Sequence, residues 1–277
     1  RTRVRSGSWG LLSPQLRYWQ RLGDSLTLSL DGTYMRADGR YPYELPNGAE
    51  RLTDKRHNTD IYSWQGEANL YALLPRGSRL DVKAQWFSSS RGLPGAVILY
   101  NTKKSHERMW DEEFFVQSVY GQDIGRRLRL EARAKYVSSW NRYADTDVKY
   151  PDGRRVETYR QNEYYASATI GWFPFRSLSL SLAQDAFVNT LSSNTENHAA
   201  PRRLTSLTAL TARWTAGRAE IGAGLVATWA TEHVERGDRP SDRRRLSPSA
   251  AFSLRLLRNE ALYLRAMYKH TFRLPAF

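Results

Sequence analysis

The stretch NEYYASATIGWFPFRSLSLSLAQDAFVN, residues 162–189, decides the fold because apolar and polar side chains alternate on both sides of a short turn, PFRS. Ile170 and Trp172 share one parity before the turn, and Leu180 and Leu182 share one after it, with small polar residues between them. A period of two is the signature of a β-strand, so the stretch predicts a hairpin with one apolar and one polar face. A soluble β-sandwich also alternates in this way, so the hairpin alone leaves water and lipid open as its surroundings.

The same alternation recurs along the chain and predicts about twelve strands. The strand at residues 128–136 is the most informative, because Arg129, Glu131, Arg133 and Lys135 share one face while Leu, Ala and Tyr residues share the other. Four charged side chains in register need water, so their face is not the interior of a sandwich. The expected strands lie within residues 12–18, 26–34, 62–72, 80–86, 113–120, 128–136, 164–172, 178–186, 210–214, 219–229, 246–256 and 262–268.

Short turns and long polar connections alternate between these strands. Outer-membrane barrels have short periplasmic turns and long extracellular loops, a pattern that a soluble barrel has no reason to adopt. Aromatic residues near strand ends, such as Trp64, Trp86, Trp172, Trp214 and Trp229, would form the two interfacial girdles. We therefore predict an all-β fold, an antiparallel transmembrane β-barrel in a bacterial outer membrane, in contact with its lipid and lipopolysaccharide. An up-and-down soluble sheet with its tryptophans packed inside is the open alternative. The short turns are expected at residues 23–24, 75–78, 125–126, 174–177, 216–218 and 258–260, and the long connections at 37–60, 88–110, 140–161, 190–203 and 233–245.

Composition limits the remaining possibilities. The 277 residues carry a formal net charge of +14 and no cysteine, which excludes disulfides and thiolate metal sites. The basic residues are spread along the chain among acidic ones and follow no nucleic-acid motif, so we expect no nucleic-acid partner. No apolar run approaches the length of a transmembrane helix. No export signal is visible at Arg1, so we expect that it was removed or that the chain is part of a longer one.

Several segments resemble the TonB-dependent receptors, the plugged outer-membrane transporters. The end of the chain is similar to the F-R-x-P barrel segment of that family, at Phe272, Arg273 and Pro275. The RGLPGA element is most similar to cobalamin-type and siderophore-type members from Bacteroidetes. The segments that carry the resemblance are SGSWG (6–10), SRGLPGAVILYN (90–101), RMWDEEFF (108–115) and HTFRLPAF (270–277).

The resemblance implies a 22-stranded barrel with a plugged lumen, of which this chain would supply about twelve strands. Residues 1–277 are then expected to form a partial barrel domain that lacks the plug domain, the TonB box and the remaining strands. The implied partners are TonB, reached through the absent plug, and a surface lipoprotein. The rival is a self-contained twelve-stranded channel or barrel lipid hydrolase, which the terminal Phe277 favours and Pro275 disfavours.

The resemblance also implies uptake of a large, scarce nutrient, with cobalamin as the first expectation and a ferric siderophore or haem as the second. Aromatic rings and guanidinium groups in the long connections suit a large, partly anionic small molecule or metal chelate, although such residues also tolerate exposed loops without binding anything. Arg129, Glu131, Arg133 and Lys135 would face the lumen and the plug, while Gly92, Pro94 and Gly95 would set loop shape. The candidate ligand-binding residues are Tyr41, Tyr43, Arg91, Tyr100, Trp140 and Tyr143.

No catalytic motif is present: G-x-S-x-G, H-E-x-x-H and the phosphate-binding G-x-x-x-x-G-K-[ST] are all missing. We therefore predict a protein that is not an enzyme and needs no cofactor. Asp111, Glu112 and Glu113 could form a calcium cluster, but an acidic strand start is the favoured interpretation. A haem or metal site above the barrel stays open as an alternative for the histidines, which we expect to be solvated: His57, His106, His198, His233 and His270.

Overall fold

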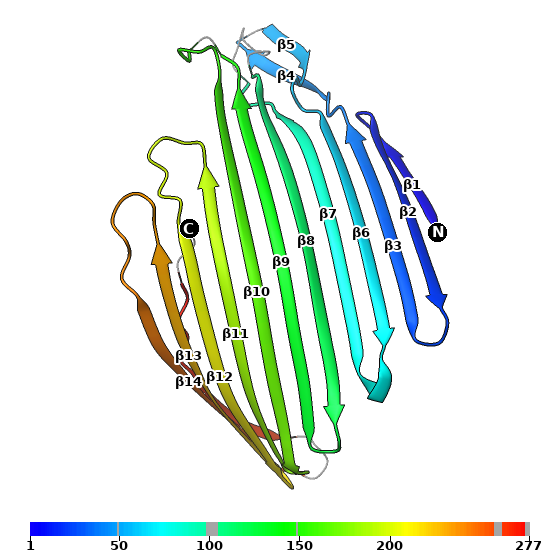
Figure 1. Cartoon of the computed structure of the whole chain (residues 1–277). Coiled ribbons are helices and arrows are strands. Elements are labelled where there is room, and N and C mark those ends of the chain that lie inside the picture. Colours follow the sequence, from blue (N-terminus) through cyan, green and yellow to red (C-terminus); the bar gives the residue numbers. More distant parts are fainter. Residues whose placement is uncertain (49, 98–104, 148, 258–261, 275–277) are drawn as a thin grey trace.

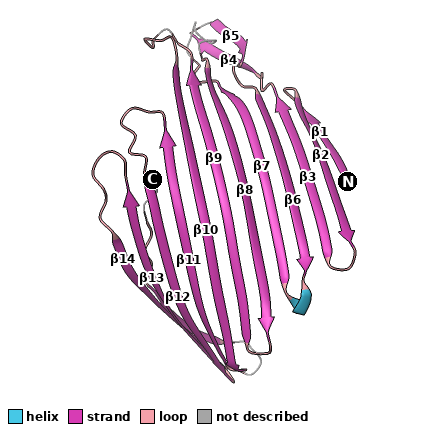
Figure 2. Ribbon diagram, in the orientation of Figure 1, coloured by secondary structure: helices cyan, strands magenta, loops and turns pink. Residues whose placement is uncertain are grey.

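The computed structural model describes residues 1–48, 50–97, 105–147, 149–257 and 262–274. Thirteen strands form one sheet in which each strand pairs antiparallel with its neighbours, and a separate two-stranded hairpin, β4–β5, interrupts the order between β3 and β6 (Figures 1 and 2). No helix in this part of the chain is long and apolar enough to cross a membrane. The strands are β1 (Thr2–Gly7), β2 (Leu11–Leu22), β3 (Leu26–Ala37), β4 (Pro42–Asn47), β5 (Glu50–Lys55), β6 (Ile61–Leu73), β7 (Arg79–Leu93), β8 (Glu107–Ile124), β9 (Leu128–Asp145), β10 (Arg155–Phe175), β11 (Leu178–Ser193), β12 (Arg202–Ala216), β13 (Ala219–His233), β14 (Arg243–Arg255) and β15 (Tyr263–Lys269), with a short 3-10 turn, η1 (Pro75–Gly77).

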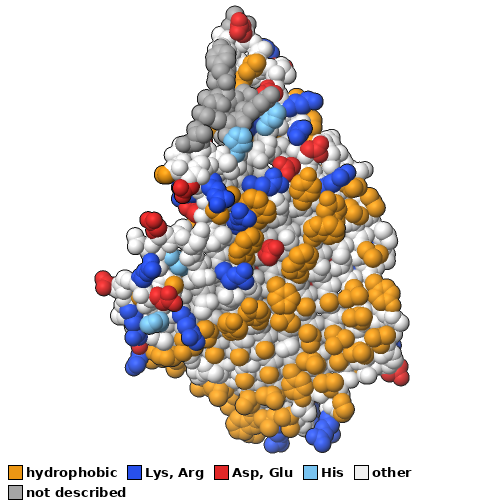
Figure 3. Space-filling model, turned by 45° about the horizontal axis from the view of Figure 1, so that its top comes forward, with side chains coloured by type: hydrophobic (Ala, Val, Ile, Leu, Met, Phe, Trp, Pro, Cys, Tyr) orange, Lys and Arg blue, Asp and Glu red, His pale blue; other side chains and the backbone are white. Residues whose placement is uncertain are grey.

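The register keeps the alternation in phase across the sheet. Ile170 of β10 lies opposite Leu130 of β9 and Leu182 of β11, so these three apolar side chains share a face. Thr169 lies opposite Glu131 and shares the other face. Repeated from strand to strand, this pairing collects the apolar side chains on one surface, which Figure 3 shows as a broad band.

The sheet is curved, and its curvature separates the two faces by exposure. Strands β13 to β15 curl behind the rest in Figure 1. Side chains crowd together on the concave side of a curved sheet and spread apart on the convex side. Large apolar residues such as Ile170 and Trp64 are 50% and 55% exposed, which places them on the convex side. We call the concave, polar side the inner face and the convex, apolar side the outer face. Except for Gly92, the buried strand residues lie on the inner face: Asn69, Ser89, Asp145, Arg203, Thr205 and Ala230.

Aromatic rings border the apolar band of the outer face. The rings of Tyr34 and Trp64 lie 4.4 Å apart, and those of Tyr136 and Tyr164 lie 4.9 Å apart. Trp172 is eight residues further along β10 than Tyr164, which is roughly 26 Å of strand at about 3.3 Å per residue. A tilted strand of that length suits the apolar band of an outer-membrane barrel, about 25 Å tall. The predicted fold class, an antiparallel β-barrel of the transmembrane type, is confirmed. We call the following aromatic residues, at the end of the band nearer the long connections, the upper aromatic row: Tyr34, Trp64, Trp86, Phe114, Tyr136, Tyr164 and Trp229.

The expected element boundaries need correction at several places. The sheet has thirteen strands, because β1 was not expected, and β4–β5 forms a hairpin inside the predicted connection 37–60. Strand extends into both ends of the predicted connections 88–110 and 140–161: β7 continues to Leu93, β8 starts at Glu107, β9 continues to Asp145, and β10 starts at Arg155. Pro174 and Phe175 end β10 instead of forming the turn. The expected turn at 258–260 and the residues Pro275 and Phe277 lie outside the described residues.

These corrections share a physical cause. Backbone pairing continues beyond the apolar band, where both faces of a strand meet polar surroundings. Apolar and polar residues then no longer need to alternate, and the sequence pattern ends before the strand does.

Candidate ligand-binding site

The long connections lie at one end of the sheet, together with the short turn between β1 and β2, and the short turns after β2, β6, β8, β10 and β12 lie at the other end (Figure 1). Gly125 and Gly217, in two of the short turns, have positive φ angles of 63° and 55°, a conformation that glycine adopts without steric cost. The end with the long connections carries the polar strand extensions described above. We call it the mouth.

A group of hydrogen bonds at the mouth, around Asn58 and Gly92, joins three segments that are distant in sequence. We call this group the ledge. The Asn58 side-chain amide donates hydrogen bonds to the backbone oxygens of Leu93, at 3.0 Å, and Glu107, at 2.6 Å. The backbone N–H of Gly92 donates to the backbone oxygen of Asp60 at 2.9 Å. A Cβ atom at Gly92 would lie 2.5 Å from the backbone oxygen of Asn58, so only glycine allows this approach. Gly92 therefore shapes the loop, as the sequence predicts.

Next to the ledge, a carboxylate on the inner face of β8 accepts hydrogen bonds from donors on both neighbouring strands. Asp111 of β8 accepts hydrogen bonds from Ser89 of β7, at 3.3 Å, and from the side-chain amide of Asn141 of β9. The Arg91 guanidinium lies 3.3 Å from the same carboxylate and remains 41% exposed. Tyr143 follows Asn141 on the same face of β9. Asp111 thus holds Arg91 in place while part of the guanidinium stays open to a ligand.

The connection between β9 and β10 is fixed by a second carboxylate. The Asp145 side chain is 4% exposed and accepts hydrogen bonds from Lys149 Nζ at 2.8 Å and from the Tyr150 hydroxyl at 2.9 Å. The hydrogen bond to Asp145 raises the pKa of Lys149, so the ammonium stays charged throughout the physiological range. This loop is therefore tied to the end of β9 at the mouth.

The structure brings only some of the predicted ligand residues together. Arg91 and Tyr143 both lie on the inner face at the mouth, each opposite Met109. Tyr41 packs its ring 6.3 Å from that of Trp9, beside the first strands, and Tyr43 belongs to β4 in the hairpin. Tyr100 lies outside the described residues.

Trp140 stands apart from the other predicted ligand residues. It lies on the outer face, opposite Glu112 and Arg160, and therefore on the other side of the sheet from Arg91 and Tyr143. Continuing the parity of Tyr136 along β9 would have indicated this orientation from the sequence.

The predicted lumen residues form ion pairs on the inner face. Arg133 Nη2 lies 2.5 Å from Glu131 Oε1, and Arg129 Nε lies 2.7 Å from Asp123 Oδ1. The Lys135 ammonium is 3.9 Å from Glu163 and 5.8 Å from the centre of the Phe115 ring. Their contact with a plug stays a prediction.

Other inner-face contacts had no sequence signal. Arg203 Nη2 lies 2.9 Å from Glu232 Oε1, with both side chains about one-tenth exposed, and Arg243 lies 3.7 Å from the same oxygen. Pairs such as Arg203 and Glu232 are distant in sequence and follow no motif. Within the described ranges, no three His, Asp or Glu side chains are grouped to hold a metal ion.

Neither a protein-family model nor a curated protein matches the sequence. Solved structures do match. The structure entitled "Copper transporter OprC" superposes with a TM-score of 0.71 at 13% identity, over 100% of this chain and 45% of its own. The ferric-catecholate import receptor Fiu from E. coli K12 gives 0.60 at 11% identity, over 91% of this chain and 51% of its own. The siderophore receptor PiuA from Acinetobacter baumannii gives 0.58 at 8% identity, over 92% and 46%.

The chain thus spans about half the length of these neighbours. At such identities the likeness concerns the fold alone. The neighbours named are a transporter and two receptors, and none is named as an enzyme.

Proposed function

We propose that the chain forms part of the barrel of a TonB-dependent uptake receptor in the bacterial outer membrane. One observation carries the proposal: a sheet with an apolar outer face and a charged inner face superposes along its whole length on a transporter barrel at a TM-score of 0.71. The resemblance of the RGLPGA and F-R-x-P segments supports the same family. A transport receptor, not an enzyme, fits these features best, and no neighbour favours the channel or lipid hydrolase alternative.

We treat residues 1–277 as a partial barrel domain. Among the described strands, β1 pairs only with β2 and β15 only with β14, so the sheet has two open edges. Unpaired backbone groups cannot remain exposed to lipid, so further strands would close the barrel. A plug inside that barrel, engaged by TonB, would lie against the ion pairs of Arg129, Glu131, Arg133 and Lys135. A surface lipoprotein partner rests on the family resemblance alone.

The proposed ligand is a metal chelate, with a ferric catecholate first. Two neighbours are named for siderophore or ferric-catecholate uptake and one for copper. Arg91 and the ring of Tyr143 offer charge-assisted hydrogen bonds and an aromatic surface to an anionic chelate at the mouth. Cobalamin, which the resemblance of RGLPGA implies, comes second because none of the three neighbours is named for it. Haem is the third candidate.

Uptake and binding together test this function. Cells with and without the gene, and with and without TonB, are compared for accumulation of radiolabelled iron supplied as a tris-catecholate, of haem iron and of labelled cyanocobalamin. We expect loss of one of these activities in both deletions. If all three are unchanged when the gene is removed, the receptor proposal is wrong.

The binding site is tested with the purified full-length receptor. Replacing Arg91 with Gln removes a charged hydrogen-bond donor and should weaken ferric-chelate binding about tenfold, measured by quenching of intrinsic fluorescence. Arg129→Gln is the matched control, because Arg129 lies on the same face at the opposite end of the strands. Equal weakening by both substitutions would contradict a site at the mouth.

A further inference from the structure

Arginines face aromatic rings repeatedly at the upper border of the outer face. Four cross-strand pairs place an arginine directly opposite an aromatic residue, on β3–β6, β8–β9, β9–β10 and β13–β14. The Arg142 guanidinium lies 4.8 Å from the centre of the Trp110 ring. Figure 3 shows basic side chains just above the apolar band. We call the outward-facing strand positions at and beyond the upper aromatic row the arginine strip. Its pairs are Arg36–Tyr62, Trp110–Arg142, Trp140–Arg160 and Trp229–Arg244.

Most arginines of this strip form no ion pair with the described residues. Several arginines of the inner face have carboxylate partners, for example Asp111 for Arg91, Glu131 for Arg133 and Glu232 for Arg203. Arg3 and Arg265, on the same face, form no ion pair with a described residue. In the strip, Arg108 is paired with Asp60 at 2.6 Å. Glu112 is the one acidic residue at the described strand positions of the strip, and it lies opposite Trp140. No ion pair with a described residue is formed by Arg36, Arg142, Arg160, Arg202 or Arg244.

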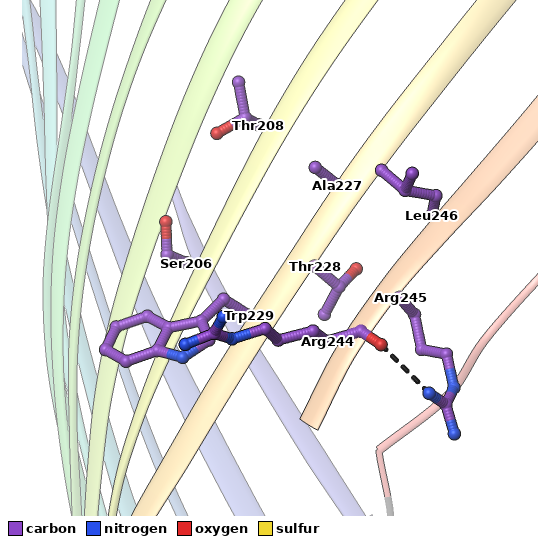
Figure 4. A pocket seen from close by; sticks show the side chains of 8 residues that line it. All are labelled: Ser206, Thr208, Ala227, Thr228, Trp229, Arg244, Arg245 and Leu246. Carbon is purple, nitrogen blue, oxygen red and sulfur yellow. Dashed lines mark hydrogen bonds between the residues drawn. The ribbon is translucent and has the colours of Figure 1, made fainter. Parts of the chain in front are cut away.

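One part of the strip contains a groove of about 750 Å³ between β12, β13 and β14. Figure 4 shows the Arg244 side chain extended beside the Trp229 ring. Asp242, two residues before Arg244, is already held by Arg239 at 2.6 Å and by the Thr231 hydroxyl at 2.8 Å. Among the described residues, no carboxylate forms an ion pair with the Arg244 guanidinium, although Asp242 lies near enough to interact with it electrostatically.

The wall of the groove is polar where lipid would be expected. Gln184 of β11 donates to the Ser206 hydroxyl at 2.9 Å and accepts from the Thr208 hydroxyl at 2.5 Å. Ala227 and Leu246 lie in the same row as Thr208 and form an apolar floor. Polar groups on a lipid-facing surface are costly unless they meet polar partners. A headgroup with hydroxyl and amide groups, attached to acyl chains, matches this arrangement.

We propose that the arginine strip binds the phosphorylated headgroup of lipopolysaccharide, with the Arg244–Trp229 groove as its principal site. A guanidinium matches a phosphate through paired hydrogen bonds, and tryptophan anchors at the boundary between headgroups and acyl chains. The polar wall would meet sugar hydroxyls, and the apolar floor would meet the start of an acyl chain. The inference rests on the proposed membrane location and not on the proposed ligand of the receptor.

The test measures lipopolysaccharide retained by the full-length receptor purified from native outer membrane. The strip variant combines Arg36→Gln, Arg160→Gln, Arg202→Gln and Arg244→Gln. The matched control loses the same charge in the short turns at the other end, through Arg126→Gln, Arg127→Gln, Arg176→Gln and Arg218→Gln. We expect the strip variant to retain at least about fivefold less lipopolysaccharide, because each arginine near an anionic surface contributes about that factor. The control should match the wild type.

A second measurement identifies the lipid. Delipidated receptor is titrated with bisphosphorylated lipid A, dephosphorylated lipid A and phosphatidylglycerol, and the complexes are counted by native mass spectrometry. Preference for the bisphosphorylated lipid, lost in the strip variant, supports the proposal. Equal binding of the dephosphorylated lipid or of phosphatidylglycerol overturns it, as does equal retention by the strip variant and the wild type.

Two controls keep the test decisive. Heat-dependent gel mobility reports whether each variant is folded, and the single substitution Arg244→Gln replaces the combined variant if the latter does not fold. Ferric-chelate binding is measured on the same samples. A receptor that binds lipopolysaccharide through the strip but no ferric chelate would refute the proposed ligand and leave the strip assignment intact.

Discussion

The two faces of β9 differ in what surrounds their charged side chains. On the inner face, Arg129 and Arg133 each lie within 2.7 Å of a carboxylate. On the outer face, small and apolar residues fill the band, and the charged residue beyond it, Arg142, lies over an aromatic ring. The surroundings of each face, and not packing in a core, therefore determine whether a strand position carries a charged or an apolar side chain.

The largest expected effect comes from moving a charge to the wrong face. Ala132→Arg places a guanidinium in the middle of the apolar band and should destabilise the inserted barrel by roughly 2–4 kcal/mol. Its neighbour Arg133 faces inward, so Arg133→Ala should be tolerated. The full-length variants are compared by urea titration after folding into lipid vesicles. Similar losses at both positions would contradict the assignment of the two faces.

The second effect tests whether inner-face arginines depend on their carboxylates. Glu232→Gln removes the negative charge between Arg203 and Arg243, while keeping the size of the side chain. Leaving a largely buried guanidinium without its anion should cost about 1–3 kcal/mol in the same titration. Glu112→Gln is the matched control, because Glu112 is exposed on the outer face, and it should change little. An equal loss in the two variants would mean that burial does not distinguish the faces.

A third prediction concerns the mouth, where protein and not lipid covers the strand ends. Gly92→Ala would bring a Cβ atom to 2.5 Å from the backbone oxygen of Asn58. Overpacking against backbone should destabilise the ledge by about 1–2 kcal/mol and raise hydrogen exchange at Leu93 and Glu107. Gly121→Ala, on the inner face of β8, is the control because no atom lies within 4 Å of the added carbon. Unchanged exchange in Gly92→Ala would show that the ledge is not rigid.

The sequence predicted the strands within the apolar band because lipid on one side and water on the other force a period of two. It did not predict β1, whose TRVRSG has no apolar alternation, or the extension of β9 to Asp145. The candidate ligand-binding site is harder to predict from the sequence than the strands are. The hydrogen bonds of Asn58 reach residues 35 and 49 positions away, and no local pattern encodes such distances. Arg91 and Tyr143 were proposed from their residue types, and only the register brings them to the same face.

The smallest expected effect comes from removing an exposed ion pair of the inner face, which can be compared with the buried pair of the same face. Arg129 and Asp123 form an ion pair 2.7 Å long, but both side chains are 62% exposed, whereas Arg203 and Glu232 are about one-tenth exposed. Exposed pairs are solvated with or without their partner and contribute little to stability, and salt reduces that contribution further. Arg129→Gln should therefore leave the urea midpoint nearly unchanged, and the small remaining difference should vanish in about 0.5 M salt. A loss as large as that of Glu232→Gln would mean that the lower end of β9 is covered in the full-length barrel, as contact with a plug would require.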